Sequence, residues 1–154
     1  MKKKIIWTTV VVVFLLLFSG CIKTHTVMKT EYFKNTAMTD KFFDNLNITT
    51  AEYEMIYPSE YWGKIEIGSP GPADPRYRGV IYIPESEGKR IMEDYQWKKN
   101  SYNLPDIGNT DSNIVWGGDW YVSEQFNNDV FKLGHDEDIR FDGKDKIIFS
   151  FGTT

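Results

Sequence analysis

The sequence has few of the residues that carry most nucleophilic and metal chemistry. It contains one cysteine and two histidines in 154 residues. A single cysteine excludes an internal disulfide framework, and two histidines fall short of the ligand set of most catalytic zinc sites. No serine stands in a Gly-x-Ser-x-Gly motif, which excludes the nucleophile elbow of the α/β-hydrolases. The sequence therefore predicts no cofactor and no bound metal ion.

Positive charge is also limited. Lys and Arg number 18 against 22 Asp and Glu, so the formal net charge is -4 at pH 7. Proteins that bind nucleic acid usually present a basic face. The sequence therefore predicts no nucleic-acid partner, and it disfavours a purely electrostatic grip on a membrane surface.

The N-terminus carries the long hydrophobic run of the chain. Three lysines, Lys2 to Lys4, precede the apolar stretch Ile5–Phe18, and the small residues Ser19 and Gly20 follow it. A charged start, an apolar centre and a small-residue end are typical of a secretory signal. An uncleaved membrane anchor is the alternative, because Ile5–Ile22 has about the shortest length that can span a bilayer.

The cysteine distinguishes the two alternatives. In the segment Leu17–Cys21, a large apolar residue and two small residues stand before the cysteine. This pattern resembles the lipobox of bacterial lipoproteins, with Phe18 where a branched aliphatic residue is usual. The resemblance implies that residues 1–20 are a signal peptide and that Cys21 is acylated after its removal. It covers only the first 21 residues and implies nothing about the fold beyond them.

Acylation would make the membrane a partner of the protein. One acyl chain holds a protein to a bilayer only marginally, whereas two or more give a stable anchor. We therefore expect a protein attached through lipid to the cell membrane or envelope, with its folded part on the extracytoplasmic side.

The remainder of the chain divides by composition. Residues 21–37 are rich in Thr and Lys and show no clean period, which predicts an acylated N-terminus and a tether with a helical turn near Tyr32. The length and composition of residues 38–154 predict one globular domain that folds without metal. We expect a fragment from Thr36 onward to fold alone as a monomer. Thr39 is the expected N-cap of a short helix that reaches Leu46.

Runs of β-branched and aromatic residues predict short antiparallel strands. The candidates are 53–57 and 64–67 around a Pro-Ser break, 77–84, a hairpin joining 114–116 to 120–122, and a C-terminal hairpin within 138–151. Asp142 and Gly143 form the expected turn of the last hairpin.

Two amphipathic helices are expected between these strands. The first begins near Pro84 and runs to about Trp97, with Gly88 and Ile91 on its buried face. The second follows the N-cap Ser123 and ends before Gly134. The fold class predicted is α+β: a single small domain with short strands, two helices and a C-terminal β-hairpin.

Aromatic residues are the plentiful class, at 16% of the chain. Trp62, Trp120 and Tyr121 stand beside glycines or in predicted turns, where rings could stack on a sugar or contact a protein. The alternative is that these rings fill the core of a small domain. The candidate binding residues are therefore Trp62, Trp120 and Tyr121.

Acidic clusters offer weaker hypotheses. The segment 135–143 lacks the ligand pattern of a calcium loop because Arg140 interrupts it, and 109–113 lacks the required glycine. We interpret both segments as solvated turns, and His135 with Asp136 and Asp138 as too sparse for a transition metal.

The sequence as a whole favours a membrane-anchored envelope lipoprotein that binds a protein or a glycan rather than catalysing a reaction. The alternative is a hydrolase of envelope polymers that uses paired carboxylates, with Asp119, Glu124 and Asp136 as candidates.

Overall fold

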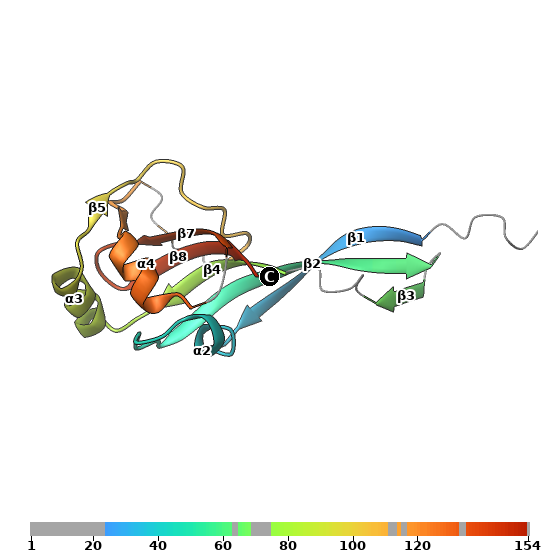
Figure 1. Cartoon of the computed structure of the whole chain (residues 1–154), viewed down its shortest axis with the longest axis horizontal. Helices are drawn as coiled ribbons and strands as arrows, with labels where there is room; N and C mark the ends of the chain where they lie inside the picture. The colour runs from blue at the N-terminus through green and yellow to red at the C-terminus, as the bar shows by residue number, and fades with distance from the viewer. Residues whose placement is uncertain are drawn as a thin grey trace, which may run out of the picture.

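An antiparallel sheet forms the centre of the structure (Figure 1). The structure is a computed structural model, and it describes residues 24–62, 65–68, 75–110, 114, 117–132 and 135–153. The strands are β1 (Thr24–Lys34), β2 (Thr50–Trp62), β3 (Ile65–Gly68), β4 (Arg76–Tyr82), β5 (Lys98–Lys99), β6 (Tyr121–Val122), β7 (His135–Phe141) and β8 (Lys146–Gly152). Their order is β1-β2-β4-β8-β7-β6-β5, and β3 pairs with the end of β2. The helices of the described residues are α2 (Thr39–Phe42), α3 (Glu85–Asp94) and α4 (Glu124–Val130). The fold is α+β.

The first two strands form a long ribbon that extends beyond the helices (Figure 1). β1 pairs with β2 from Thr24, opposite Trp62, to Lys34, opposite Glu52. The expected tether with a helical turn is therefore wrong over this range. Phe33 shows why the segment is a strand: its ring stacks on Tyr53 of β2, with the ring centroids 5.0 Å apart.

The expected break at Pro58 is also absent, because β2 runs through it as a strand of 13 residues. The pairing of β2 with β4 ends at Ile56, and its pairing with β3 begins at Glu60. Pro58 lies between these two pairings, so its missing N–H removes no bond to β3 or β4. The strands at this end of the sheet are longer than the short strands that the sequence predicts.

Helices α2, α3 and α4 cover one face of the sheet. The main core cluster lies between them and includes Phe42, Ile91, Phe126 and Val130 from the helices. Its sheet side is formed by alternate residues of the central strands, among them Ile81, Ile147, Phe149 and Phe151. The predicted alternation of the last three residues onto one face is confirmed.

Both predicted helices are present. The Ser123 hydroxyl caps α4 by accepting a hydrogen bond of 3.2 Å from the Phe126 N–H. A Cβ atom added at Gly88 in α3 would collide with the Lys144 carbonyl oxygen in the turn between β7 and β8. The glycine is therefore what allows the helix to approach that turn closely.

The helix ends differ from those expected. α4 stops at Val130, well before Gly134, because Phe131 leaves the helix and forms a β-bridge with Phe43. α2 has four residues and ends at Phe42 rather than at Leu46. Its N-cap is Met38, and the Thr39 hydroxyl instead donates a hydrogen bond of 2.7 Å to the Thr36 carbonyl.

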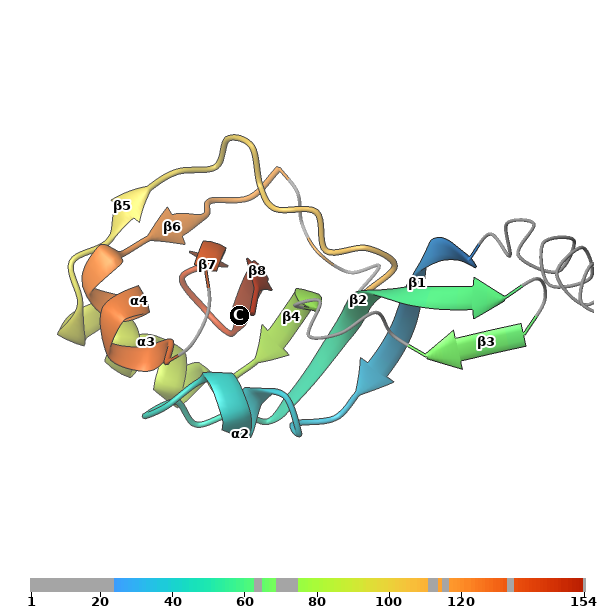
Figure 2. The same ribbon diagram turned by 45° about the vertical axis from the view of Figure 1, so that its right-hand side comes forward.

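The described parts of the chain between β5 and β6, residues 100–110, 114 and 117–120, cover the opposite face of the sheet (Figure 2). A second core cluster lies beneath it and contains Val80, Ile107, Ile114, Trp120 and Ile148. Ile114 lies outside the described strands, and β6 pairs with β5 and β7. The expected hairpin from 114–116 to 120–122 is therefore not formed as predicted, and residues 115–116 lie outside the described range.

The C-terminal hairpin is confirmed, and Asp142 organises its turn. One oxygen of the Asp142 side chain accepts hydrogen bonds from the backbone N–H groups of Lys144, Asp145 and Lys146, at 2.8, 2.9 and 3.0 Å.

No helix within the described residues has the length and apolar character needed to cross a membrane.

Candidate functional site

The structure buries one of the three aromatic residues predicted to bind a ligand. Trp120 is only 2% exposed and packs in the second core cluster beneath the chain that joins β5 to β6. The expectation that the turn leaves this ring outside the core is wrong. The neighbouring loop folds back over the sheet and encloses the ring, which is the alternative that the sequence left open.

The other two aromatic residues do not form a surface with it. Tyr121 is half-buried in β6, where it pairs opposite Phe141 and Lys99. Trp62 ends β2 at the far end of the ribbon, and its side chain lies outside the described part of the structure. Because β6 and β2 are separated by three strands in the sheet, these residues do not make one stacking platform.

The candidate catalytic carboxylates have separate surroundings. Asp119 forms an ion pair of 2.5 Å with Lys99 on the surface. Glu124 lies in the first turn of α4 and lines an open depression of about 480 Å³ together with Gln96, Asn128 and Asp129. The side chain of Asp136 is outside the described residues. Of the three candidates, Glu124 alone lines this depression, and the second carboxylate there is Asp129, which the sequence did not single out.

The acidic segment near the C-terminus is engaged in internal contacts. Asp138 accepts hydrogen bonds from the Arg140 guanidinium at 2.5 and 3.1 Å. Among the described residues, no group of three His, Cys, Asp or Glu side chains has an arrangement that could hold a metal ion. Asn109 of the second candidate loop binds Glu54 instead, and residues 111–113 lie outside the described range.

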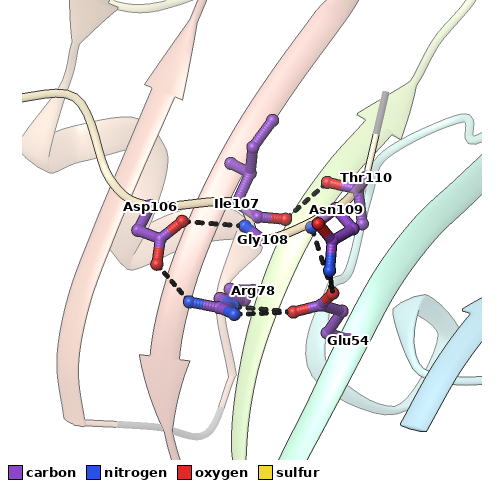
Figure 3. Close-up of polar contacts among 7 residues, drawn as sticks. All are labelled: Glu54, Arg78, Asp106, Ile107, Gly108, Asn109 and Thr110. Atoms are coloured by element: carbon purple, nitrogen blue, oxygen red, sulfur yellow. Dashed lines mark hydrogen bonds and ion pairs between the residues drawn. The ribbon is translucent and has the colours of Figure 1, made fainter. Parts of the chain in front are cut away.

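A buried polar network that sequence reasoning missed lies on the loop-covered face of the sheet (Figure 3). Glu54 of β2 is 2% exposed, and one of its oxygens accepts two hydrogen bonds from Arg78 of β4, at 2.9 and 2.7 Å. Its other oxygen accepts bonds from the backbone and the side-chain amide of Asn109, at 3.0 and 3.2 Å. Arg78 also forms an ion pair with Asp106.

The network keeps Glu54 ionised. Burial raises the pKa of the carboxyl, but the hydrogen bonds from the Asn109 backbone and from Arg78 outweigh burial and hold the pKa below its ordinary value. A carboxylate with a lowered pKa suits a structural ion pair and not a general acid. The network therefore fastens the loop to the sheet.

Gly108 shows how tightly the loop is held. Its φ of +67° is in the left-handed region, where glycine is favoured, and an added Cβ would collide with the Glu54 carboxylate. The sequence signal was weak, because Glu54 and Arg78 are far apart in the chain. Only the register of β2 with β4, which places them opposite each other, shows that they pair.

The exposed strand β1 is a second feature that the sequence did not indicate. The exposed large hydrophobic residues of the described chain are Val27, Met28, Tyr32 and Tyr102. All but the last lie on β1, which is the terminal strand of the sheet. The β1–β2 ribbon is thus the part of the described structure where apolar side chains and a strand edge coincide.

The buried network and the exposed ribbon have different uses. The network holds a loop in place. The outer edge of β1, by contrast, pairs with no further strand among the described residues, so another chain could add a strand there. The ribbon is therefore the stronger candidate for an interaction site. A comparison with protein-family models, curated proteins and solved structures found no match to this chain.

Proposed function

We propose that the protein is a lipid-anchored, non-enzymatic interaction module of a bacterial cell envelope. The observation that carries this proposal is the position of Thr24 in the fold. β1 starts at Thr24, at the end of the ribbon away from α3 and α4 (Figure 1), and only Ile22 and Lys23 separate it from Cys21. An acyl group on Cys21 would attach the folded body to the membrane through the ribbon.

The buried carboxylates of the folded domain fit a role in binding better than a role in catalysis. Glu54 is tied to Arg78, and Glu87 of α3 accepts hydrogen bonds from Arg90 and from the Asn47 backbone. The Arg90 guanidinium holds the pKa of Glu87 below its ordinary value despite burial. Both carboxylates therefore favour the ionised form in structural contacts, while the exposed edge of β1 supports the binding of another polypeptide chain.

The lipid anchor at Cys21 is tested by expressing the full chain in bacteria. Growth with an alkyne-tagged fatty acid should label the protein, and mass spectrometry should find an acylated Cys21 as the mature N-terminus. Cys21→Ser should abolish the label and release the protein from the membrane fraction. An intact Met1, or a mature chain with an unmodified Cys21, would overturn the anchor.

The non-enzymatic role is tested separately, with the purified lipoprotein and isolated cell-wall glycan. We expect no release of soluble glycan fragments, whether or not the protein sediments together with the glycan. Glycan release by the wild-type chain that is lost in Asp119→Asn or Glu124→Gln would contradict the proposal and favour the hydrolase alternative.

A further inference from the structure

The edge of β1 has the features of a strand that pairs with another strand. Strand β1 has 11 residues, about twice the usual strand length, and it pairs with β2 without a register shift. Natural edge strands are commonly shortened, bulged, interrupted by proline or lined with charged residues, above all lysine, which discourages pairing with another chain. Of these devices β1 has only charge, at Lys29, Glu31 and Lys34. The sequence of β1 contains no proline. Its outer side carries no further strand within the described residues.

Apolar side chains are exposed on both faces of this edge. Met28 is 59% exposed and Tyr32 is 52% exposed, and their positions place them on the same face of the strand. Val27 is 44% exposed and lies on the other face, together with Phe33. An added strand would cover apolar groups on both faces at once, whereas a partner resting on a single face would cover only one set.

We propose that β1 pairs antiparallel with β1 of a second copy of this chain, about a twofold axis at Thr30. In this register Lys29 lies opposite Glu31 of the second copy, and Met28 lies opposite its Tyr32. Val27 lies opposite Phe33. Every one of these pairs is of a kind that stabilises cross-strand contacts: opposite charges, or two apolar side chains.

Charge selects this register over its neighbours. A pair centred on Lys29 would place two lysines opposite each other, and a pair centred on Glu31 would place two glutamates opposite each other. Like charges directly across a strand pair are destabilising. In the structure the Tyr57 hydroxyl donates a hydrogen bond to Glu31 from the neighbouring strand, which holds this carboxylate on the ribbon.

The pairing also agrees with two anchors in one membrane. The Thr24 residues of the two copies would lie at opposite ends of the paired strands, about 40 Å apart at the usual rise of a strand. Both N-termini can then reach the same bilayer when the paired strands lie along its plane. The helices of both copies would lie on the same side of the combined sheet.

The test is disulfide trapping of the full chain in bacterial membranes. Thr30→Cys places two thiols on the twofold axis, so mild oxidation should give a covalent dimer. Thr26→Cys is the control, because this exposed position on the same strand would lie about 26 Å from its counterpart. Equal trapping at both positions, trapping at neither, or a bond from position 30 to a different protein would overturn the proposal.

The wild-type chain separates this test from the lipid anchor. A covalent dimer of the wild-type chain after oxidation would show that Cys21 is a free thiol, and so that the anchor is wrong. Trapping that appears with Thr30→Cys and is absent from the wild-type chain reports on the pairing alone.

Charge reversal tests the register. Lys29→Glu and Glu31→Lys, each added to Thr30→Cys, should reduce trapping, with dimer affinity falling roughly tenfold because like charges then face each other. The double reversal Lys29→Glu with Glu31→Lys restores opposite charges and should restore trapping. Single reversals without effect, or a double reversal as weak as the single ones, would contradict this register.

Discussion

Glu54 divides its two carboxylate oxygens between two parts of the chain: one oxygen binds Arg78 on the neighbouring strand, and the other binds Asn109 in the loop. The same buried group thus stabilises the pairing of β2 with β4 and the closure of the loop over the sheet. Removing it would disturb both contacts.

Glu54→Gln should therefore cost about 2 kcal/mol of unfolding free energy, the order of magnitude for hydrogen bonds to a charged group, because Arg78 loses its buried partner but keeps Asp106. Urea unfolding of the two proteins measures the loss. Asp94→Asn is the matched control, because Asp94 pairs with Arg90 at the surface and should cost about 0.5 kcal/mol. Equal losses in the two variants would show that the Glu54 network does not fasten the loop.

Stability should fall on acidification. The pKa values of Glu54 and Glu87 both lie below the ordinary value of 4.5 in the folded protein, so the folded state binds fewer protons than the unfolded state. Their contribution is complete above pH 4.5 and is lost as the pH falls through the folded pKa values. Unfolding measured from pH 7 to 3 tests this. The Glu54→Gln, Glu87→Gln variant should lose less stability over this range than the wild type.

Trp120→Ala should destabilise the protein by about 3–5 kcal/mol, because it empties the centre of the second core cluster. Thermal or urea unfolding gives the loss. Tyr102→Ala changes an aromatic residue of the same loop that is 83% exposed, and should stay within about 0.5 kcal/mol of the wild type. A stable, well-folded Trp120→Ala protein would return this ring to the candidate binding residues.

Gly88→Ala should be destabilising although alanine favours helices, because the new methyl group meets the Lys144 carbonyl. Overpacking of this kind costs about 1–3 kcal/mol. Lys89→Ala, one residue along on the exposed side of α3, should have little effect on the unfolding free energy. If Gly88→Ala is the more stable of the two, α3 is not held against this turn.

Removal of β1 should weaken the folded body. A chain that begins at Thr36 loses the Phe33–Tyr53 stack and leaves β2 without its outer partner. Its melting temperature should be lower by about 5 °C or more than that of a chain that begins at Thr24. Equal melting temperatures would instead support the domain boundary that composition alone suggests.

The sequence predicts the elements whose signals are local. Ser123 and the spacing from Phe126 to Val130 indicate α4, and the alternation of Ile147, Phe149 and Phe151 indicates β8. β1 was missed because an edge strand needs few buried residues, so its Thr-rich and Lys-rich composition is similar to that of a tether. The pairing of β1 with β2 and the stack of Phe33 on Tyr53 reveal its role.

The burial of Trp120 and the Glu54–Arg78 pair could not be predicted for another reason. Both depend on which loop covers the second face of the sheet and on the register between β2 and β4. These are contacts between residues far apart in the chain, and neither spacing nor composition specifies them. Trp62 and Asp136 remain untested as site residues, because their side chains lie outside the described part of the structure.

The turn at Asp142 has a consequence for the fidelity of folding. In a sheet with one wet face, a slip of one residue moves the apolar set of a strand into water and is strongly penalised. β8 is apolar on both faces, since Ile148 packs into one core cluster and Phe149 into the other. Hydrophobicity alone therefore discriminates poorly between alignments of this central strand. The Asp142 carboxylate, which holds the N–H groups of the next residues, distinguishes the correct alignment from its neighbours.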